Sequence, residues 1–162
     1  MSKLETAYYK SPVGILKIIG NDGGIQIIDY TEENSFEKKE IASTLIKKCI
    51  FQLDEYFSGT RKEFEIDLNI KGTKFQEKVW QELLEVPFGK TRSYLQQTKA
   101  IGDVKAIRAV ASANGKNPIS IIVPCHRIIG SDGSLTGYAG GIWRKKWLLE
   151  HESGCKQQRL FS

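Results

Sequence analysis

The chain has 162 residues, of which 40% are hydrophobic and 27% are charged, and this composition excludes an intrinsically disordered chain. No apolar run approaches the ~18 residues that a membrane span needs, and no secretory leader is visible, so we expect no membrane partner. The net charge of +5 suits a polyanionic partner such as nucleic acid, although many basic proteins bind nothing anionic.

Strand patterns come first along the chain. Segments 13–19 and 24–30 flank Asn21-Asp22-Gly23, which is a strong turn signal for a β-hairpin. A further strand is expected over residues 4–10. The sequence therefore predicts a small antiparallel sheet at the N-terminus.

One helix is expected after these strands. Apolar residues at helical spacing predict it over residues 37–57, with Gly59 as its C-cap. Cys49 lies on the apolar stripe, so we interpret it as a core residue. Alternating apolar residues over 64–70 then predict an extended segment. We place the domain boundary here, which gives domains over 1–70 and 71–152 and a C-terminal tail over 153–162.

Helical patterns dominate the second domain. Thr73 and Gln76 form a capping box ahead of its first helix. The next two helices are joined across Ile101-Gly102, at the spacing of a helix-turn-helix. A glycine-rich loop precedes the last helix. The ranges expected are helices over 93–100, 103–114 and 142–152, and the loop over 137–141.

The two sides of the predicted helix 103–114 differ in character. Val104, Ile107 and Val110 form a stripe that we expect to face inward. The opposite side carries small residues between two cations: Lys105, Ala109, Ser112 and Lys116. This surface suits a helix pressed into a DNA groove, but an ordinary amphipathic helix with solvated lysines has the same pattern.

The most reactive group of the chain lies in the sequence Val-Pro-Cys-His-Arg, residues 123–127. Cys125 is a soft nucleophile next to His126, one of two histidines. The apolar residues before it predict a partly dry pocket, in which burial raises the thiol pKa, so a base or fixed dipoles must form the thiolate. These residues alone also allow a plain core cysteine.

The numbers of cysteines and histidines argue against a disulfide framework and against a metal site. Three widely spaced cysteines do not make a disulfide framework, which indicates a reducing compartment: the cytoplasm, or the nucleus of a eukaryote. With two histidines and no Cys-x-x-Cys motif, we expect no metal site.

Five segments of the second domain carry a resemblance. They are Arg108-Ala109-Val110, Asn117-Pro118, Pro124-Cys125-His126-Arg127, Gly137-Tyr138-Ala139-Gly140-Gly141 and Trp147-Leu148-Leu149-Glu150-His151-Glu152. Together they resemble the O6-alkylguanine-DNA alkyltransferases, also called methylated-DNA–protein-cysteine methyltransferases. The match is close over residues 73–152 and holds in outline before them.

The resemblance implies a fold and an activity. The fold class is α/β (α+β), with an N-terminal antiparallel-sheet, ribonuclease-H-like domain and a mainly helical, winged helix-turn-helix-like alkyltransferase domain. The activity is direct repair of O6-alkylguanine, and less efficiently of O4-alkylthymine, in duplex DNA. Cys125 takes the alkyl group once and irreversibly. No cofactor is needed, because the lesion is the donor and the protein is the acceptor.

The resemblance also implies how the thiol is activated. His126 is the base, and Glu152 accepts the other imidazole N–H, as a carboxylate does in a catalytic triad. Adjacent side chains of an extended segment point to opposite faces, so a direct bond from Cys125 to His126 is awkward. A bridging water, as in the family, fits better.

The remaining expected site residues are also carried over from the family. Tyr94 contacts the guanine and helps to protonate the leaving group, and Arg108 is the arginine finger that fills the gap left by the flipped base. Asn117 is the hinge that connects the recognition helix to the chain leading to Cys125. The alkyl group is enclosed by a loop, and backbone groups read the guanine edge. The loop residues are Tyr138, Ala139 and Gly140, and the backbone groups belong to Cys125 and Ile128.

The chain departs from the family pattern at several pocket positions. Ala111 and Ser112 replace glycine or other small residues but remain small themselves. Ser120 stands where some members have proline, and Ala139 stands where others have serine. These changes put the tolerance for bulky alkyl groups in doubt, but not methyl transfer.

The tail suggests a second partner. Gln157-Gln158-Arg159-Leu160-Phe161 resembles the peptide by which bacterial repair proteins bind the sliding clamp, with Gln157, Leu160 and Phe161 as contacts. Alternatively, the two apolar residues fold back on the domain. We expect a monomer.

Two other functions stay open on the residues alone. A cysteine hydrolase also uses a thiol and a histidine, but nothing here suggests an acyl-substrate site. A DNA-binding module without catalysis, either a regulator or a lesion sensor, also fits the helix pair. The presence of Cys125 argues against a lesion sensor.

Overall fold

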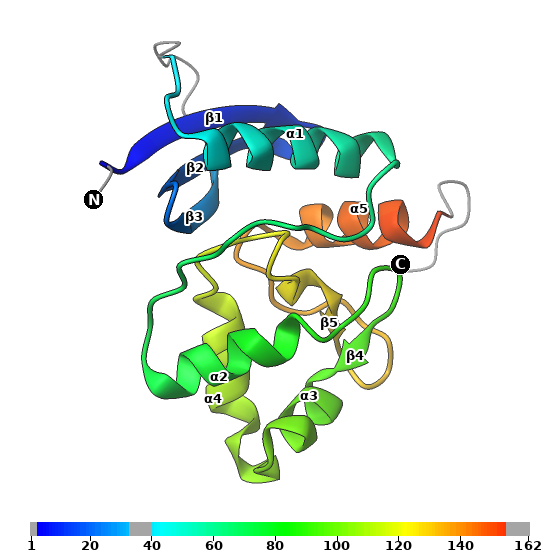
Figure 1. The fold of residues 1–162 in the computed structure, drawn as a ribbon. Coiled ribbons are helices and arrows are strands. Elements are labelled where there is room, and N and C mark those ends of the chain that lie inside the picture. The colour runs from blue at the N-terminus through cyan, green and yellow to red at the C-terminus, as the bar shows by residue number, and fades with distance from the viewer. Residues whose placement is uncertain (1–2, 33–39, 155–162) are drawn as a thin grey trace. The chain divides into compact units, whose positions relative to one another are not determined.

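The computed structural model describes residues 3–32 and 40–154, and the chain divides into two compact units (Figure 1). The first unit contains the residues up to Lys71 together with Pro118–Ser120. The second contains Gly72–Asn117 and the residues from Ile121 onward. Among the residues described, no helix is long and apolar enough to cross a lipid bilayer.

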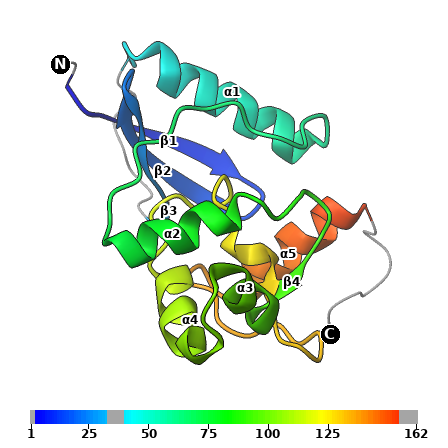
Figure 2. The ribbon, with the colours of Figure 1, turned by 60° about the horizontal axis from the view of Figure 1, so that its bottom comes forward.

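A three-stranded antiparallel sheet and one helix form the first unit. Strands β1 (Glu5–Ser11), β2 (Gly14–Asn21) and β3 (Gly24–Thr31) pair in chain order, and the predicted turn joins β2 to β3. Helix α1 (Thr44–Ser58) lies along the sheet in both ribbon views (Figure 1 and Figure 2). Its inward face includes fully buried Cys49, which confirms that this cysteine is a core residue.

Helix α1 begins later than the apolar spacing predicts. It starts at Thr44, where the hydroxyl oxygen of Ser43 accepts a backbone N–H from the first turn. The carboxylate of Glu5 accepts the N–H groups of Ala42 and Ser43, at 2.9 and 2.8 Å. Because a side chain from β1 holds these amides, they are not available to the helix. The predicted start at residue 37 is therefore wrong.

Two later segments pair with the outer edge of β3. Leu68 forms a parallel bridge to Ile25 and so belongs to an extended segment, as the alternation predicted. Further along the chain, Ile28 donates its N–H to the carbonyl of Pro118 at 3.0 Å and accepts from the N–H of Ser120 at 2.9 Å. The chain that leads to Cys125 thus adds a short pairing segment to the first unit.

The second unit is mainly helical, as expected, so the mixed α/β fold class is confirmed. Trp80 is buried in it and donates its indole N–H to the carbonyl of Ala113 at 2.9 Å, which connects two helices. The predicted capping box of Thr73 and Gln76 is present. The elements are α2 (Lys74–Leu83), β4 (Arg92–Ser93), α3 (Tyr94–Ile101), η1 (Val104–Ala106), α4 (Ile107–Gly115), η2 (Cys125–Arg127), β5 (Ile128–Ile129) and α5 (Ile142–Ser153), where η denotes a 3₁₀ turn.

The inward stripe predicted for the second helix of the pair is wrong in part. Val110 is fully buried, but Val104 is 52% exposed and Ile107 is 37% exposed. Val104 lies in the 3₁₀ turn η1, which has about three residues per turn instead of 3.6 and so shifts the helical phase. The buried face of α4 is formed by Val110, Ala113 and Asn114.

Candidate active site

Cys125 opens the 3₁₀ turn η2, directly after Pro124, and is buried with 8% of its surface exposed. The side-chain amide of Asn117 donates to the carbonyl of Val123 at 2.7 Å and to Cys125 Sγ at 3.3 Å. This amide therefore connects the segment just after α4 to the residues around the sulfur. The extended backbone expected at Cys125 and His126 is wrong, because both lie in η2.

The backbone is strained shortly before the sulfur. Ile121 has a φ of 74°, and it is the one non-glycine residue with positive φ in the part of the chain that the structure describes. The left-handed conformation costs an L-residue about 1–2 kcal/mol. Because Ile121 is almost fully buried, its packed side chain can hold the backbone there.

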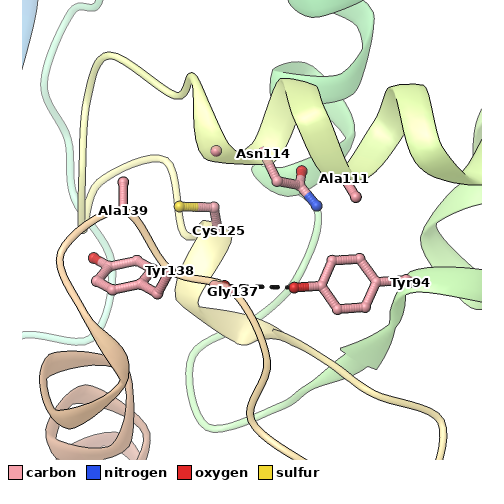
Figure 3. A pocket seen from close by; sticks show the side chains of 8 residues that line it. Tyr94, Ala111, Asn114, Cys125, Gly137, Tyr138 and Ala139 are labelled. Carbon is pink, nitrogen blue, oxygen red and sulfur yellow. Dashed lines mark hydrogen bonds between the residues drawn. The ribbon is translucent and has the colours of Figure 1, made fainter.

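A cavity of about 170 Å³ lies beside Cys125 (Figure 3). Helix α4 forms one side of it, and the loop before α5 forms another. Its lining residues are Tyr94, Ala111, Asn114, Gly115, Cys125, Gly137, Tyr138 and Ala139. A second hollow of about 400 Å³ shares Tyr94, Ala111 and Gly137 with it and also reaches Ile107, Arg108 and Thr136. A ligand in the cavity could therefore extend toward the outer surface of α4.

The thiol is not activated by its surroundings alone. Burial raises the pKa of Cys125 above its ordinary value. The hydrogen bond from Asn117 and the positive charge of Lys145 oppose this shift, but burial is the larger effect. A proton acceptor is therefore needed to form the thiolate near neutral pH.

A buried trio of side chains includes the two residues that follow Cys125 in the chain, His126 and Arg127, together with Glu152. His126 Nε2 and Glu152 Oε2 are 2.7 Å apart, and neither side chain is more than 1% exposed. Arg127 binds the same carboxylate through two nitrogens: Nε donates to Oε1 at 2.7 Å and Nη2 donates to Oε2 at 3.0 Å. Within the described residues, His126 Nδ1 is buried and has no hydrogen-bond partner.

The charges of this trio can be assigned. Burial raises the pKa of Glu152, but His126 and Arg127 together lower it further, so the carboxyl is ionised. Burial lowers the pKa of His126, and the opposing influence of Glu152 is smaller, so the neutral imidazole is the favoured form. An ionised carboxylate cannot donate, so Nε2 carries the ring proton and Nδ1 carries the lone pair.

A second polar junction holds the loop over the cavity. The hydroxyl of Tyr94, the first residue of α3, donates to the carbonyl of Thr136 at 2.7 Å. Lys145 Nζ donates to the carbonyls of Thr136 and Gly137 at 3.1 and 3.3 Å. Lys145 is fully buried, and burial lowers its pKa to about 8. Burial likewise raises the pKa of Tyr94.

Tyr94, which was also expected to contact DNA, is half-buried, whereas the other expected DNA-facing residues are exposed. They are Lys105, Arg108, Ala109, Ser112 and Lys116. Arg108 also lines the second hollow together with Tyr94, so this surface borders the cavity of Cys125.

Two expected pocket residues do not line the cavity. The side chain of Ile128 is fully buried, and its N–H donates to the carbonyl of Cys125. Gly140 is buried, and its carbonyl accepts from Arg144 at 2.8 Å. The tail residues Gln157, Leu160 and Phe161 lie outside the described residues.

Sequence reasoning missed three residues of the site. Arg127 and Lys145 are charged groups that the fold buries, and Asn114 faces the cavity while its amide pairs with Gln97 in both directions, at 2.7 and 2.8 Å. The position of Arg127 next to His126 was a signal, because a buried arginine needs an acidic partner and Glu152 was already a candidate. No comparable signal marked Lys145.

Comparisons with known proteins match almost the whole chain. Residues 4–70 match the family described as "6-O-methylguanine DNA methyltransferase, ribonuclease-like domain", and residues 74–154 match "6-O-methylguanine DNA methyltransferase, DNA binding domain". A methylated-DNA–protein-cysteine methyltransferase of Methanosarcina acetivorans is 41% identical, over 92% of this chain and 98% of its own length. The one from Mycobacterium tuberculosis is 45% identical over 88% of each chain.

Solved structures of O6-methylguanine methyltransferases also resemble this chain. The crystal structure of the O6-methylguanine methyltransferase of M. tuberculosis superposes with a TM-score of 0.84, at 40% identity over 98% of both chains. A structure of the enzyme from this organism in complex with DNA has a TM-score of 0.82, at 43% identity over 94% of this chain and 93% of that one.

Proposed function

Because this chain belongs to the methylated-DNA–protein-cysteine methyltransferases, a family of DNA-repair alkyltransferases, we propose that it repairs O6-alkylguanine in duplex DNA by moving the alkyl group to Cys125. The cavity beside the Cys125 sulfur is the observation that carries this assignment. It has room for a small alkyl group and part of a base. O4-alkylthymine is a poorer substrate of the same site.

The reaction is a single displacement at saturated carbon. The sulfur of Cys125 forms a bond to the alkyl carbon while the bond from that carbon to guanine O6 breaks, and the electron pair leaves with the base. Cys125 loses its thiol proton and the released guanine gains one, so the number of protons does not change in the reaction. The thioether has no simple route back to a thiol, so each chain reacts once.

The buried trio supports a route for the proton. His126 Nδ1 carries a lone pair and has no partner among the described residues, so it can accept the thiol proton through a water molecule. The imidazolium that forms is stabilised by Glu152 at 2.7 Å. Cys125, His126 and Glu152 come from one chain, and this supports action as a monomer.

Access to the lesion requires the nucleotide to leave the base stack, because O6 lies inside the duplex. We assign this task to α4, whose exposed face carries Lys105, Ala109, Ser112 and Lys116 for the backbone and groove. Arg108 fills the gap in the stack, and its place beside the second hollow supports this role. The DNA complex of the M. tuberculosis enzyme supports a duplex as the ligand.

Tyr94 acts on the leaving group. Its hydroxyl lies at the mouth of the cavity and can give a proton to the departing guanine once it leaves the carbonyl of Thr136. Tyr138 and Ala139 enclose the alkyl group from the loop side.

Mass spectrometry of the intact protein tests the proposal. After mixing with a duplex that contains O6-methylguanine, one methyl group should be found on Cys125, and none on the Cys125→Ser variant. Cys49→Ala is the matched control, because Cys49 is a buried cysteine whose pKa burial raises to about 12, and it should react like the wild type.

The other outcomes separate the alternatives. A protein that binds the duplex but takes up no methyl group would be a DNA-binding module without catalysis. Hydrolysis of an ester or peptide substrate without methyl uptake would indicate a cysteine hydrolase.

We also propose that the tail binds a bacterial sliding clamp through Gln157, Leu160 and Phe161. The sequence of residues 157–161 is the support for this contact. In a pull-down with the clamp, the Leu160→Ala/Phe161→Ala double variant should be lost from the bound fraction. Equal retention of the double variant and the wild type would contradict it.

A further inference from the structure

Arg127 is held by several contacts at once. Besides its two bonds to Glu152, its Nη1 donates to the carbonyl of Val86 at 2.7 Å. Its guanidinium carbon lies 5.8 Å from the centre of the Phe88 ring. Only 7% of the residue is exposed. Such a planar, bidentate arrangement fixes both partners in position.

Arg127 and His126 share one carboxylate oxygen. Glu152 Oε2 accepts from His126 Nε2 at 2.7 Å and from Arg127 Nη2 at 3.0 Å. An arginine side chain stays charged at all relevant pH values, so it compensates the carboxylate permanently. Because Arg127 already compensates the negative charge of Glu152, His126 can donate to this carboxylate as a neutral imidazole.

Burial is the largest influence that lowers the pKa of His126, and the charged groups around the imidazole act in both directions. From α5, Glu152 raises the pKa of His126, whereas Lys145 lowers it. From η2, Arg127 lowers it, and the neighbouring Cys125 carries its proton before the reaction. Tyr94, across the cavity, is also uncharged, because burial raises its pKa. Glu152 is thus the one group here that favours the imidazolium, and Arg127 neutralises it.

We propose, on the basis of the function proposed above, that Arg127 is a positioning residue: by sharing Glu152 with His126, it keeps the imidazole neutral and leaves Nδ1 as the acceptor of the Cys125 proton. Without Arg127, His126 and Glu152 would form an ion pair of their own. Nδ1 would then carry a proton in the resting protein and could not accept another. The base would be lost although His126 and Glu152 were both present.

Imidazole ¹⁵N NMR tests this directly, because the chain has two histidines and His151 serves as the internal reference. In the wild type, His126 should be the neutral Nε2–H tautomer at pH 7. In Arg127→Gln, it should be protonated at pH 7 and titrate at higher pH. A wild-type His126 that is an imidazolium or the Nδ1–H tautomer at pH 7 would overturn the proposal, whether or not any variant folds.

Methyl transfer gives the second readout. Below the new imidazole pKa, the single-turnover rate of Arg127→Gln should fall about tenfold for each pH unit and should recover as the pH is raised. A merely structural role would lower the rate equally at all pH values. Arg61→Gln, which removes an ion pair with Glu55 within the first unit, is the control and should keep the wild-type pH profile.

The outcomes distinguish this inference from the proposed function. If wild-type protein transfers methyl groups and Arg127→Gln is folded with a neutral His126 and an unshifted pH profile, the role of Arg127 is refuted and the function stands. If the wild type transfers no methyl group, the function fails, and the NMR result alone decides how Arg127 acts on His126. Should Arg127→Gln not fold, Arg127→Gln/Glu152→Gln removes both charges together, and its His126 should remain neutral at pH 7.

Discussion

The hydroxyl of Tyr94 donates a hydrogen bond to the carbonyl of Thr136, 2.7 Å away, on the loop that covers the cavity of Cys125. Lys145 donates to the same carbonyl at 3.1 Å. The loop is therefore held by two donors, and one of them is also the proposed proton donor. In the proposed mechanism, Tyr94 exchanges this carbonyl for the lesion, and Lys145 still donates to the loop.

Tyr94→Phe should slow methyl transfer without unfolding the protein. The variant loses the proposed proton donor, so the single-turnover rate should fall roughly 100-fold. The lost hydrogen bond to Thr136 should lower the free energy of unfolding by about 1 kcal/mol. Quenched-flow kinetics and urea unfolding measure the two effects. An unchanged rate would show that the guanine is protonated by another group.

Arg108→Ala should impair repair of duplex DNA selectively. Because flipping a base costs a few kcal/mol, loss of the residue proposed to fill the gap should slow the reaction with duplex about tenfold or more. The free O6-methylguanine base needs no flipping, so its slower reaction should continue at the wild-type rate. Equal slowing with both substrates would place Arg108 in the chemistry instead.

Lys105→Ala and Lys116→Ala should weaken DNA binding at all sequences. Each removes a proposed phosphate contact, so the slope of log affinity against log salt should become shallower by about 1. Fluorescence anisotropy over a series of salt concentrations measures this slope. Lys47→Ala on α1 exchanges an exposed lysine of the first unit and should leave the slope unchanged.

Gln97→Ala should destabilise the helix pair. Gln97 and Asn114 are buried and bind each other through two hydrogen bonds, so removal of one amide leaves the other unpaired. This should cost about 1–3 kcal/mol in the free energy of unfolding. In Gln97→Leu/Asn114→Leu neither amide is left unpaired, so stability should be partly regained. A double variant less stable than both single variants would contradict this account.

Acid should destabilise the protein in two steps. The pKa of His126 is held below its ordinary 6.5 and that of Glu152 below its ordinary 4.5, so in both cases the unfolded chain binds the proton first. The free energy of unfolding should therefore fall as the pH drops below about 6.5, and fall further below about 4.5. Urea unfolding over a pH series measures this. His126→Asn should lose the first step and retain the second.

The parts of the fold that were predicted depend on neighbours in the sequence. The turn at Asp22, the capping box of Thr73 and Gln76, and the C-cap at Gly59 each involve residues at most a few positions apart. Cys125 and His126 were found for the same reason, as adjacent residues of unusual chemistry. Local pattern and local structure agree at these positions.

The parts that were missed depend on distant partners. The start of α1 is set by Glu5, which is 37 positions before Ala42. Arg127 gains its role from Glu152, 25 positions later. Val104 is exposed because a 3₁₀ turn changes the helical phase, which residue spacing cannot show. Only the folded chain brings such groups together.

The left-handed backbone of Ile121 makes the location of the nucleophile dependent on core packing. An isoleucine released from its neighbours would relax to negative φ and recover about 1–2 kcal/mol, and the following residues would turn with it. Cys125 would then drift from Asn117 even though no atom of the cavity had been altered. Buried substitutions near Ile121 should therefore lower the reactivity of Cys125 while the protein remains folded.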